Sequence, residues 1–93
     1  MKYKVELSTQ FKKDYKNIMK DTNDIELLDK VITMLANGEK LPAKYRDHSL
    51  KGKFKGLREC HIKPDWLLIY KIHNKRLILY LSRTGSHSQV LNM

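Results

Sequence analysis

Three strand-like runs that follow one another almost without interruption constrain the fold of this chain most strongly. Residues 57–63, 66–73 and 76–83 are rich in apolar and aromatic side chains, and only Pro64-Asp65 and Asn74-Lys75 separate them. Such short separators are typical of tight turns between antiparallel strands, because a parallel connection needs about a dozen residues or more. The second half of the chain therefore predicts an antiparallel meander.

The first half has the pattern of one strand and two helices. Residues 3–7 alternate between apolar and charged side chains, as a half-buried strand does. Ser8 is typical of a helix N-cap, and an apolar stripe at helical spacing follows it, formed by Phe11, Tyr15, Ile18 and Met19. A second stripe follows a capping-box pattern at Asn23 and Glu26 and ends at the stop residue Gly38; its members are Ile25, Leu28, Val31, Ile32 and Leu35.

The order strand, helix, helix, loop and strands predicts an α+β fold. A chain of 93 residues has room for one hydrophobic core, so residues 1–93 are expected to form a single domain. We expect a helical hairpin on one face of a twisted sheet with three or four antiparallel strands. The other sheet face is expected to stay open. Within the meander, Cys60 and Ile62 should point to the core and Glu59 and His61 away from it, because side chains alternate along a strand.

The excess of positive over negative charge lies entirely in the second half. Residues 1–39 carry seven Lys or Arg and seven acids, whereas residues 40–93 carry twelve Lys or Arg and three acids, which gives the net charge of +9. This excess favours a polyanion such as nucleic acid, with an acidic protein as a compatible partner and a merely solvated surface as the simpler alternative. The long loop at 39–56 holds six of these cations, and three of them, Lys51, Lys53 and Lys55, are candidates for binding phosphates.

The single cysteine, Cys60, cannot form an intramolecular disulfide, which favours a reducing compartment such as the cytoplasm. The first residues alternate in character and contain no continuous apolar segment, so neither a signal peptide nor a membrane span is expected.

Several side chains in the second half suit proton transfer next to a phosphate. Imidazole moves protons near neutral pH, and a carboxylate and a fixed cation complete the set needed for RNA cleavage by the neighbouring 2′-hydroxyl. The candidates are His48, His61, Asp65, Arg83 and His87. Each also has a plain structural interpretation: a loop histidine is often only solvated, Asp65 after a proline is a common turn residue, and Arg83 could be an exposed charge.

Metal and cofactor chemistry fit this sequence less well. Two-metal nucleases need clustered carboxylates, and the three acids of the second half are well separated. Cys60 and His61 should point to opposite sides of a strand, which disfavours a zinc site, and no phosphate-binding glycine loop is present. We therefore expect neither a metal nor a cofactor.

Three motifs together resemble the YafQ-type toxins of the RelE/ParE superfamily. They are DHSLKG at residues 47–52, RECHIKPDWLLIY at 58–70 and RTGSH at 83–87, in the family's order and spacing. Residues 1–41 agree in predicted layout more than in identity. The resemblance implies a RelE-like fold and a ribosome-dependent, metal-independent endoribonuclease that cuts translated mRNA and is blocked by a cognate antitoxin, for which an acidic segment is expected.

The resemblance also implies roles for individual residues. His48, His61, Asp65 and His87 are similar to the family's acid–base residues, Trp66 to one that shapes the site, and Arg83 to a phosphate-binding arginine. From residue type alone, Trp66 could equally be a core residue. Family members often carry an aromatic residue four positions after the last histidine, whereas this chain has Leu91 there, so a stacking contact to an mRNA base is expected to be missing.

Two other functions remain open at this point. One is a toxin with the same fold that acts on a topoisomerase, against which the aligned histidines argue. The other is a non-catalytic module that binds RNA or an acidic protein through its basic surface, which would need lysines and arginines but no histidine set.

Overall fold

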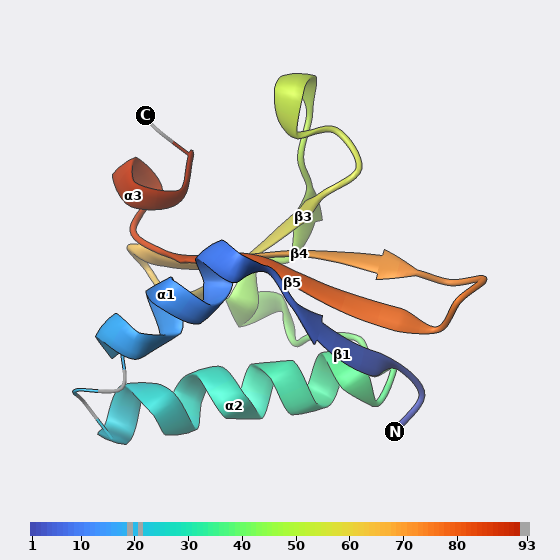
Figure 1. Cartoon of the computed structure of the whole chain (residues 1–93), viewed down its shortest axis with the longest axis horizontal. Coiled ribbons are helices and arrows are strands. Elements are labelled where there is room, and N and C mark those ends of the chain that lie inside the picture. The colour runs from blue at the N-terminus through green and yellow to red at the C-terminus, as the bar shows by residue number, and fades with distance from the viewer. Residues whose placement is uncertain (19, 21, 92–93) are drawn as a thin grey trace.

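A five-stranded sheet with the strand order β1-β5-β4-β3-β2 forms the centre of the fold. The computed structural model describes residues 1–18, 20 and 22–91. Helices α1 and α2 cover one face of the sheet, and α3 lies on the other side (Figure 1). The elements are β1 (Lys4–Leu7), α1 (Thr9–Ile18), α2 (Thr22–Ala36), η1 (Ala43–Tyr45), β2 (His48–Ser49), η2 (Gly52–Phe54), β3 (Arg58–Lys63), β4 (Trp66–His73), β5 (Ile78–Gly85) and α3 (His87–Leu91).

The antiparallel meander is confirmed, with one turn longer than predicted. Strands β2 to β5 pair antiparallel in sequence order, and Pro64-Asp65 forms the two-residue turn between β3 and β4. The next turn spans residues 74–77, so β5 begins at Ile78 instead of Arg76. The reason is local: Leu77 adopts a left-handed backbone with φ of 52°, which cannot continue a strand.

The edge of β5 is shared by β1 and α1. β1 pairs parallel with β5 only between Ile78 and Leu81. The predicted cap Ser8 then starts α1, because its Oγ accepts the Phe11 amide at 2.8 Å. The same hydroxyl donates to the Ser82 carbonyl at 2.6 Å, so a side chain continues the pairing where β1 has ended. Met19, which was included in the predicted stripe, lies outside the described residues.

The prediction that Gly38 terminates α2 is confirmed, whereas the predicted N-terminus of this helix is slightly wrong. Gly38 has φ of 78°, and the amides of Gly38 and Glu39 donate to Leu35 and Met34, which is the Schellman pattern. The helix already begins at Thr22, so Asn23 lies in its first turn instead of at the cap.

Apolar side chains pack on both faces of the sheet, so the expectation of one open face is wrong in part. The main cluster lies between the sheet and the two long helices and includes Cys60 and Ile62, as predicted. A smaller cluster on the opposite face joins strand β4 to α3 and to the basic loop; it consists of Leu67, Ile69, Val90 and Leu91, packed against Leu50, Phe54 and Leu57.

Helix α3 was not predicted, although a sequence signal for it exists. The Ser86 amide donates to Oε1 of Gln89 at 2.9 Å, and the Gln89 amide donates to the Ser86 hydroxyl at 3.4 Å, which is a reciprocal capping box. The helix buries Leu91, only 4% exposed, in the smaller apolar cluster. None of the described helices is long and apolar enough to cross a membrane.

Candidate functional site

Strand register places the candidate residues in two neighbouring rows on the sheet face away from α1 and α2. Residues directly opposite one another in an antiparallel pair share a face. His48 pairs with Glu59, Glu59 with Ile69 and Ile69 with Arg83, which forms the first row. The second row runs from His61 through Leu67 to Gly85, two residues before His87.

Glu59 connects two of the candidate histidines, and sequence reasoning did not select it as a functional residue. It is 3% exposed. Its Oε1 lies 3.1 Å from Nε2 of His61 and 3.6 Å from Nε2 of His48. A buried carboxylate needs such partners, because an unpaired charge in the interior is costly. The available signal was its strand parity, which put Glu59 and His61 on the same polar face.

The other nitrogens of both rings face main-chain carbonyls. Nδ1 of His61 lies 3.2 Å from the Pro64 oxygen, and Nδ1 of His48 lies 2.8 Å from the Arg46 oxygen. Each ring is therefore held from two sides, by Glu59 and by a turn or loop carbonyl. The His61 side chain is mostly buried, whereas that of His48 is half exposed.

His87 completes the group from the start of α3. Its ring centroid lies 5.9 Å from that of His61. Its Nδ1 is 3.9 Å from Oδ1 of Asp65, and Asp65 also accepts the His87 amide at 3.5 Å. Asp65 is largely exposed in the β3–β4 turn. The structure thus brings together the four predicted acid–base residues His48, His61, Asp65 and His87.

Arg83 shares the face of the histidines but is already paired. Its Nε and Nη2 both lie 3.1 Å from the carboxylate of Asp14 on α1. Asp14 also accepts the Thr84 amide at 3.1 Å. Sequence reasoning had no signal for this pair, because it joins positions 69 residues apart.

Trp66 lies on the core face instead of among the histidines. It is 9% exposed and packs in the main cluster. Its indole N–H donates to the Thr84 hydroxyl at 2.8 Å, and that hydroxyl donates to the Leu67 carbonyl. The alternative that Trp66 is a core residue describes its position correctly. Trp66 can influence the histidines only indirectly, through the strands to which it is bonded.

The predicted lysines lie on the projecting loop around η2. Lys51, Lys53 and Lys55 are all exposed. Phe54 in this loop packs against the smaller apolar cluster and so holds the loop next to the sheet. Figure 1 shows this loop and α3 on the same side of the sheet, opposite α2.

Asp47 fixes the segment that carries His48. Its Oδ2 accepts Nη2 of Arg58 at 2.9 Å, and its Oδ1 accepts the hydroxyl of Tyr70. Burial is the main cause that raises the pKa of Tyr70 far above its ordinary value of 10, and the bond to Asp47 adds to it. The phenol therefore stays a neutral donor under Asp47.

The arrangement brings together three imidazoles and the carboxylates of Glu59 and Asp65, with Arg83 in the same strand row as Glu59. Imidazoles on both sides of a space can take a proton from one oxygen and give a proton to another. No group of three His, Cys, Asp or Glu side chains within the described ranges is arranged so that it could hold a metal ion. Acid–base chemistry on an anionic substrate is the chemistry that these groups can carry out.

Comparison with known proteins identifies the class. Residues 3–92 match the family described as "Bacterial toxin of type II toxin-antitoxin system, YafQ". The chain therefore belongs to the YafQ family of bacterial toxins, and the RelE-like fold expected from its motifs is confirmed.

Its relatives share most of their length with it. The mRNA interferase toxin YafQ of Escherichia coli K12 is 44% identical over 85 residues, covering 90% of each chain. A crystal structure of the Escherichia coli DinJ–YafQ complex matches with a TM-score of 0.84 and 40% identity over 95% of this chain and 97% of the other. A metal-bound toxin from Helicobacter pylori matches with a TM-score of 0.87 and 46% identity over 95% and 98%.

Proposed function

We propose that this protein is an mRNA interferase: a ribosome-dependent, metal-independent endoribonuclease that cuts translated mRNA. The observation that carries the proposal is the histidine group, in which Glu59 holds His48 and His61 and the His87 ring lies 5.9 Å from that of His61. The name of the 44% identical relative, an mRNA interferase toxin, supports the same activity.

The proposed reaction starts from the 2′-hydroxyl of the nucleotide before the cut. A base removes its proton, the oxygen attacks the adjacent phosphorus, and the bond to the 5′-oxygen of the next nucleotide breaks. His87 donates a proton to that leaving oxygen, which leaves a 2′,3′-cyclic phosphate on one fragment. The half-exposed ring of His87 at the start of α3 suits a donor that must reach substrate.

Two residues are candidates for the base, and the geometry supports each in a different respect. The spacing between His61 and His87 lets a phosphate lie between an acceptor and a donor, which favours His61. Both nitrogens of His61 already face acceptors, Glu59 and the Pro64 carbonyl, which favours Asp65. The variants Asp65→Asn and His61→Gln separate these two routes. Only the variant that lacks the true base should lose the activation of the 2′-hydroxyl.

The cations are assigned to the phosphates. Arg83, held by Asp14, stabilises charge on the phosphorane through the guanidinium edge that Asp14 leaves free. The exposed lysines Lys51, Lys53 and Lys55 attract the mRNA backbone. Trp66 shapes the site from the core side through its bond to Thr84.

The proposed partner besides translated mRNA is a cognate antitoxin. The related Escherichia coli toxin crystallises in a complex with DinJ. A net charge of +9 favours an antitoxin segment rich in acidic residues, which would cover or reshape the histidine group. Because translated mRNA and an intracellular antitoxin are both found in the cytoplasm, we propose a cytoplasmic location.

The test compares growth arrest and mRNA cuts after induced expression in bacteria, with primer extension to map the cuts. The variants are His87→Ala, and His48→Gln combined with His61→Gln. Glutamine is chosen because its amide can still donate to Glu59, whereas alanine would leave that buried carboxylate without partners and unfold the chain for an unrelated reason. His73→Gln is the matched control, since His73 lies at the far end of β4.

Codon-phased cuts that vanish in both site variants but persist in the control would support the nuclease. Arrest without cuts, unchanged in the site variants, would contradict it and favour the topoisomerase-directed toxin. RNA or antitoxin binding without arrest would favour the non-catalytic module.

A further inference from the structure

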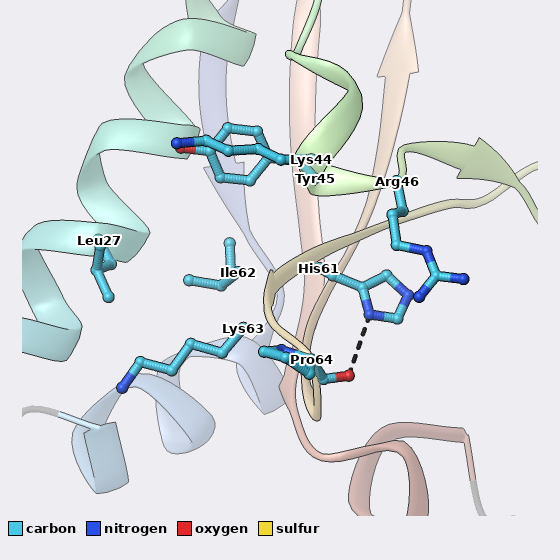
Figure 2. Close-up of a pocket in the computed structure, with 8 residues that line it drawn as sticks. All are labelled: Leu27, Lys44, Tyr45, Arg46, His61, Ile62, Lys63 and Pro64. Atoms are coloured by element: carbon cyan, nitrogen blue, oxygen red, sulfur yellow. Dashed lines mark hydrogen bonds between the residues drawn. The ribbon is translucent and has the colours of Figure 1, made fainter.

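A hollow next to His61 combines an apolar floor with a basic rim, and the proton-transfer scheme makes no use of it. Its volume is about 240 Å³. Figure 2 shows its lining, with Leu27 and Lys63 on one side, Ile62 between, and the His61 ring and Arg46 on the other side. The lining residues are Leu27, Lys44, Tyr45, Arg46, His61, Ile62, Lys63 and Pro64. Pockets for drug-sized ligands are larger, roughly 300–1,000 Å³, so this one suits a single flat group such as a nucleobase.

Leu27 makes the floor accessible. This side chain is 39% exposed, so its apolar surface can be reached from the solvent. It comes from α2, whereas the neighbouring Ile62 comes from β3, so the floor is built where the helix layer meets the strand of His61. An apolar floor of this kind can contact the face of a base.

Arg46 links this hollow to the histidine group by its backbone. It ends η1 with φ of 51°, a left-handed conformation that is uncommon for a residue with a side chain. Its carbonyl oxygen lies 2.8 Å from Nδ1 of His48. Strained backbone that persists in a fold often serves a functional site. Here it fixes a candidate histidine, and the same residue lines the hollow, with its side chain beside the His61 ring (Figure 2).

Among the cations of the rim, the Arg46 guanidinium is the one best able to bind a phosphate, because the other two already have partners. Lys63 is engaged with Asp24 at 2.7 Å, and Lys44 lies 5.2 Å from the centroid of the Tyr45 ring. Within residues 1–18, 20 and 22–91, the Arg46 side chain makes no ion pair or hydrogen bond. A guanidinium presents a planar fork of donors that matches two phosphate oxygens.

We propose that this hollow is a nucleotide subsite for the mRNA next to the cut: a base lies on Leu27 and Ile62 while Arg46 binds the phosphate beside it. The inference rests on the proposed function. It names the part of the substrate that this hollow binds, namely the nucleotide next to the phosphate that is cut. RNA is favoured over an acidic protein segment because the floor and the cation together fit one nucleotide, and because His61 itself forms a wall of the hollow.

The test measures single-turnover cleavage on ribosomes programmed with mRNA, over a range of protein concentrations. Arg46→Gly is the main variant, because glycine keeps the left-handed backbone and the carbonyl on His48 while it removes the guanidinium. Arg76→Gly is the matched control: it removes the same charge from the exposed turn at the other end of the β4–β5 hairpin. We expect Arg46→Gly to slow cleavage at subsaturating protein on the order of ten-fold, and Arg76→Gly to have no effect.

A series of mRNAs, each with one uncharged methylphosphonate linkage near the cut, identifies the contact. At one linkage the difference between the unaltered chain and Arg46→Gly should disappear, since the arginine has lost its partner there. A parallel series of mRNAs, each with one abasic nucleotide, tests the base contact with the variant Leu27→Ser. The rate difference between this variant and the unaltered chain should disappear when the missing base is the one next to that linkage. Leu77→Ser is the control, since Leu77 is also an exposed leucine.

The outcomes separate this inference from the proposed function. An Arg46→Gly defect of equal size on every modified mRNA, or no defect at all, would overturn the subsite while cleavage by the unaltered chain still supported the nuclease. A variant that cuts normally but binds the antitoxin more weakly would assign the hollow to the antitoxin and also overturn it. Failure of the unaltered chain to cut would overturn the nuclease, and the subsite with it.

Discussion

Asp14 on α1 holds the guanidinium of Arg83 on β5 through two hydrogen bonds of 3.1 Å each. Asp14 is 8% exposed and also accepts the Thr84 amide, at the part of the β5 edge that β1 does not reach. One carboxylate therefore closes a sheet edge and orients a cation on the face of the histidines. This explains how a helix remote from the site in sequence contributes to it.

Removing either member of this pair should destabilise the fold by about 1–3 kcal/mol, and the two losses should not add. Asp14→Ala frees the Thr84 amide and the guanidinium, whereas Arg83→Ala leaves a buried carboxylate with fewer partners. Urea unfolding of both single variants and of the double variant measures the coupling. Losses that add within error would mean that the two side chains stabilise the fold independently. Asp29→Asn, on the exposed side of α2, controls for the lost negative charge.

The local elements of the fold could be predicted because their signals are local. Ser8, Gly38 and the Pro64-Asp65 turn depend on bonds to residues a few positions away, so their sequence context contains the information. The error at Leu77 arose because a left-handed leucine has no sequence signature. The position of β1 was not predictable for another reason: parallel pairing with β5 joins segments more than 70 residues apart.

The candidate site divides in the same way. Strand parity correctly put His61 and Glu59 on the face opposite Cys60 and Ile62. The chemistry of imidazole suggested the other histidines, and the family resemblance supported them. The partners of those residues were missed, because the contacts of Glu59 with His48 and of Asp14 with Arg83 form only when separate elements meet. A buried acid between basic groups has no linear motif.

Glu59→Gln should reduce mRNA cleavage on the order of ten-fold or more, with a smaller effect on mRNA binding. Glutamine fills the same volume but removes the charge that holds His48 and His61, so the rings lose their common anchor. Single-turnover rates at saturating protein give the effect on the chemical step, and half-saturating concentrations report binding. Glu39→Gln, an exposed change, is the control. A full cleavage rate in Glu59→Gln would show that the carboxylate does not position the histidines.

Asp47→Ala should lower the free energy of unfolding by about 1–3 kcal/mol, and Tyr70→Phe by less, about 1 kcal/mol. The first change removes the acceptor for both Arg58 and Tyr70, whereas the second leaves the Arg58–Asp47 pair in place. Asp47→Ala should also slow cleavage, because Asp47 anchors the segment that carries His48. Chemical unfolding and cleavage assays on the same preparations check both effects. Equal destabilisation by the two changes would contradict this order.

Cys60 should be unreactive toward thiol reagents in the folded chain and should make the fold less stable at alkaline pH. Burial is the main cause that raises the pKa of its thiol from 9.0 to about 12, and the nearby carboxylates of Asp47 and Glu59 add to it. Because the folded pKa lies above the unfolded one, the stabilisation is complete below pH 9 and is lost as the pH rises toward 12. The loss at pH 10 should be about 1 kcal/mol.

Unfolding measured between pH 8 and 10 on the unaltered chain and on Cys60→Ala isolates this contribution. The alanine variant should be less stable at pH 8, because it leaves space in the core, but its stability should fall less steeply with pH. The pKa of Tyr70 is also raised, so Tyr70 lowers the free energy of unfolding at higher pH, and it does so equally in both proteins. Identical slopes, or rapid labelling of native Cys60 at pH 8, would show that the thiol is not held in the core between β3 and the two long helices.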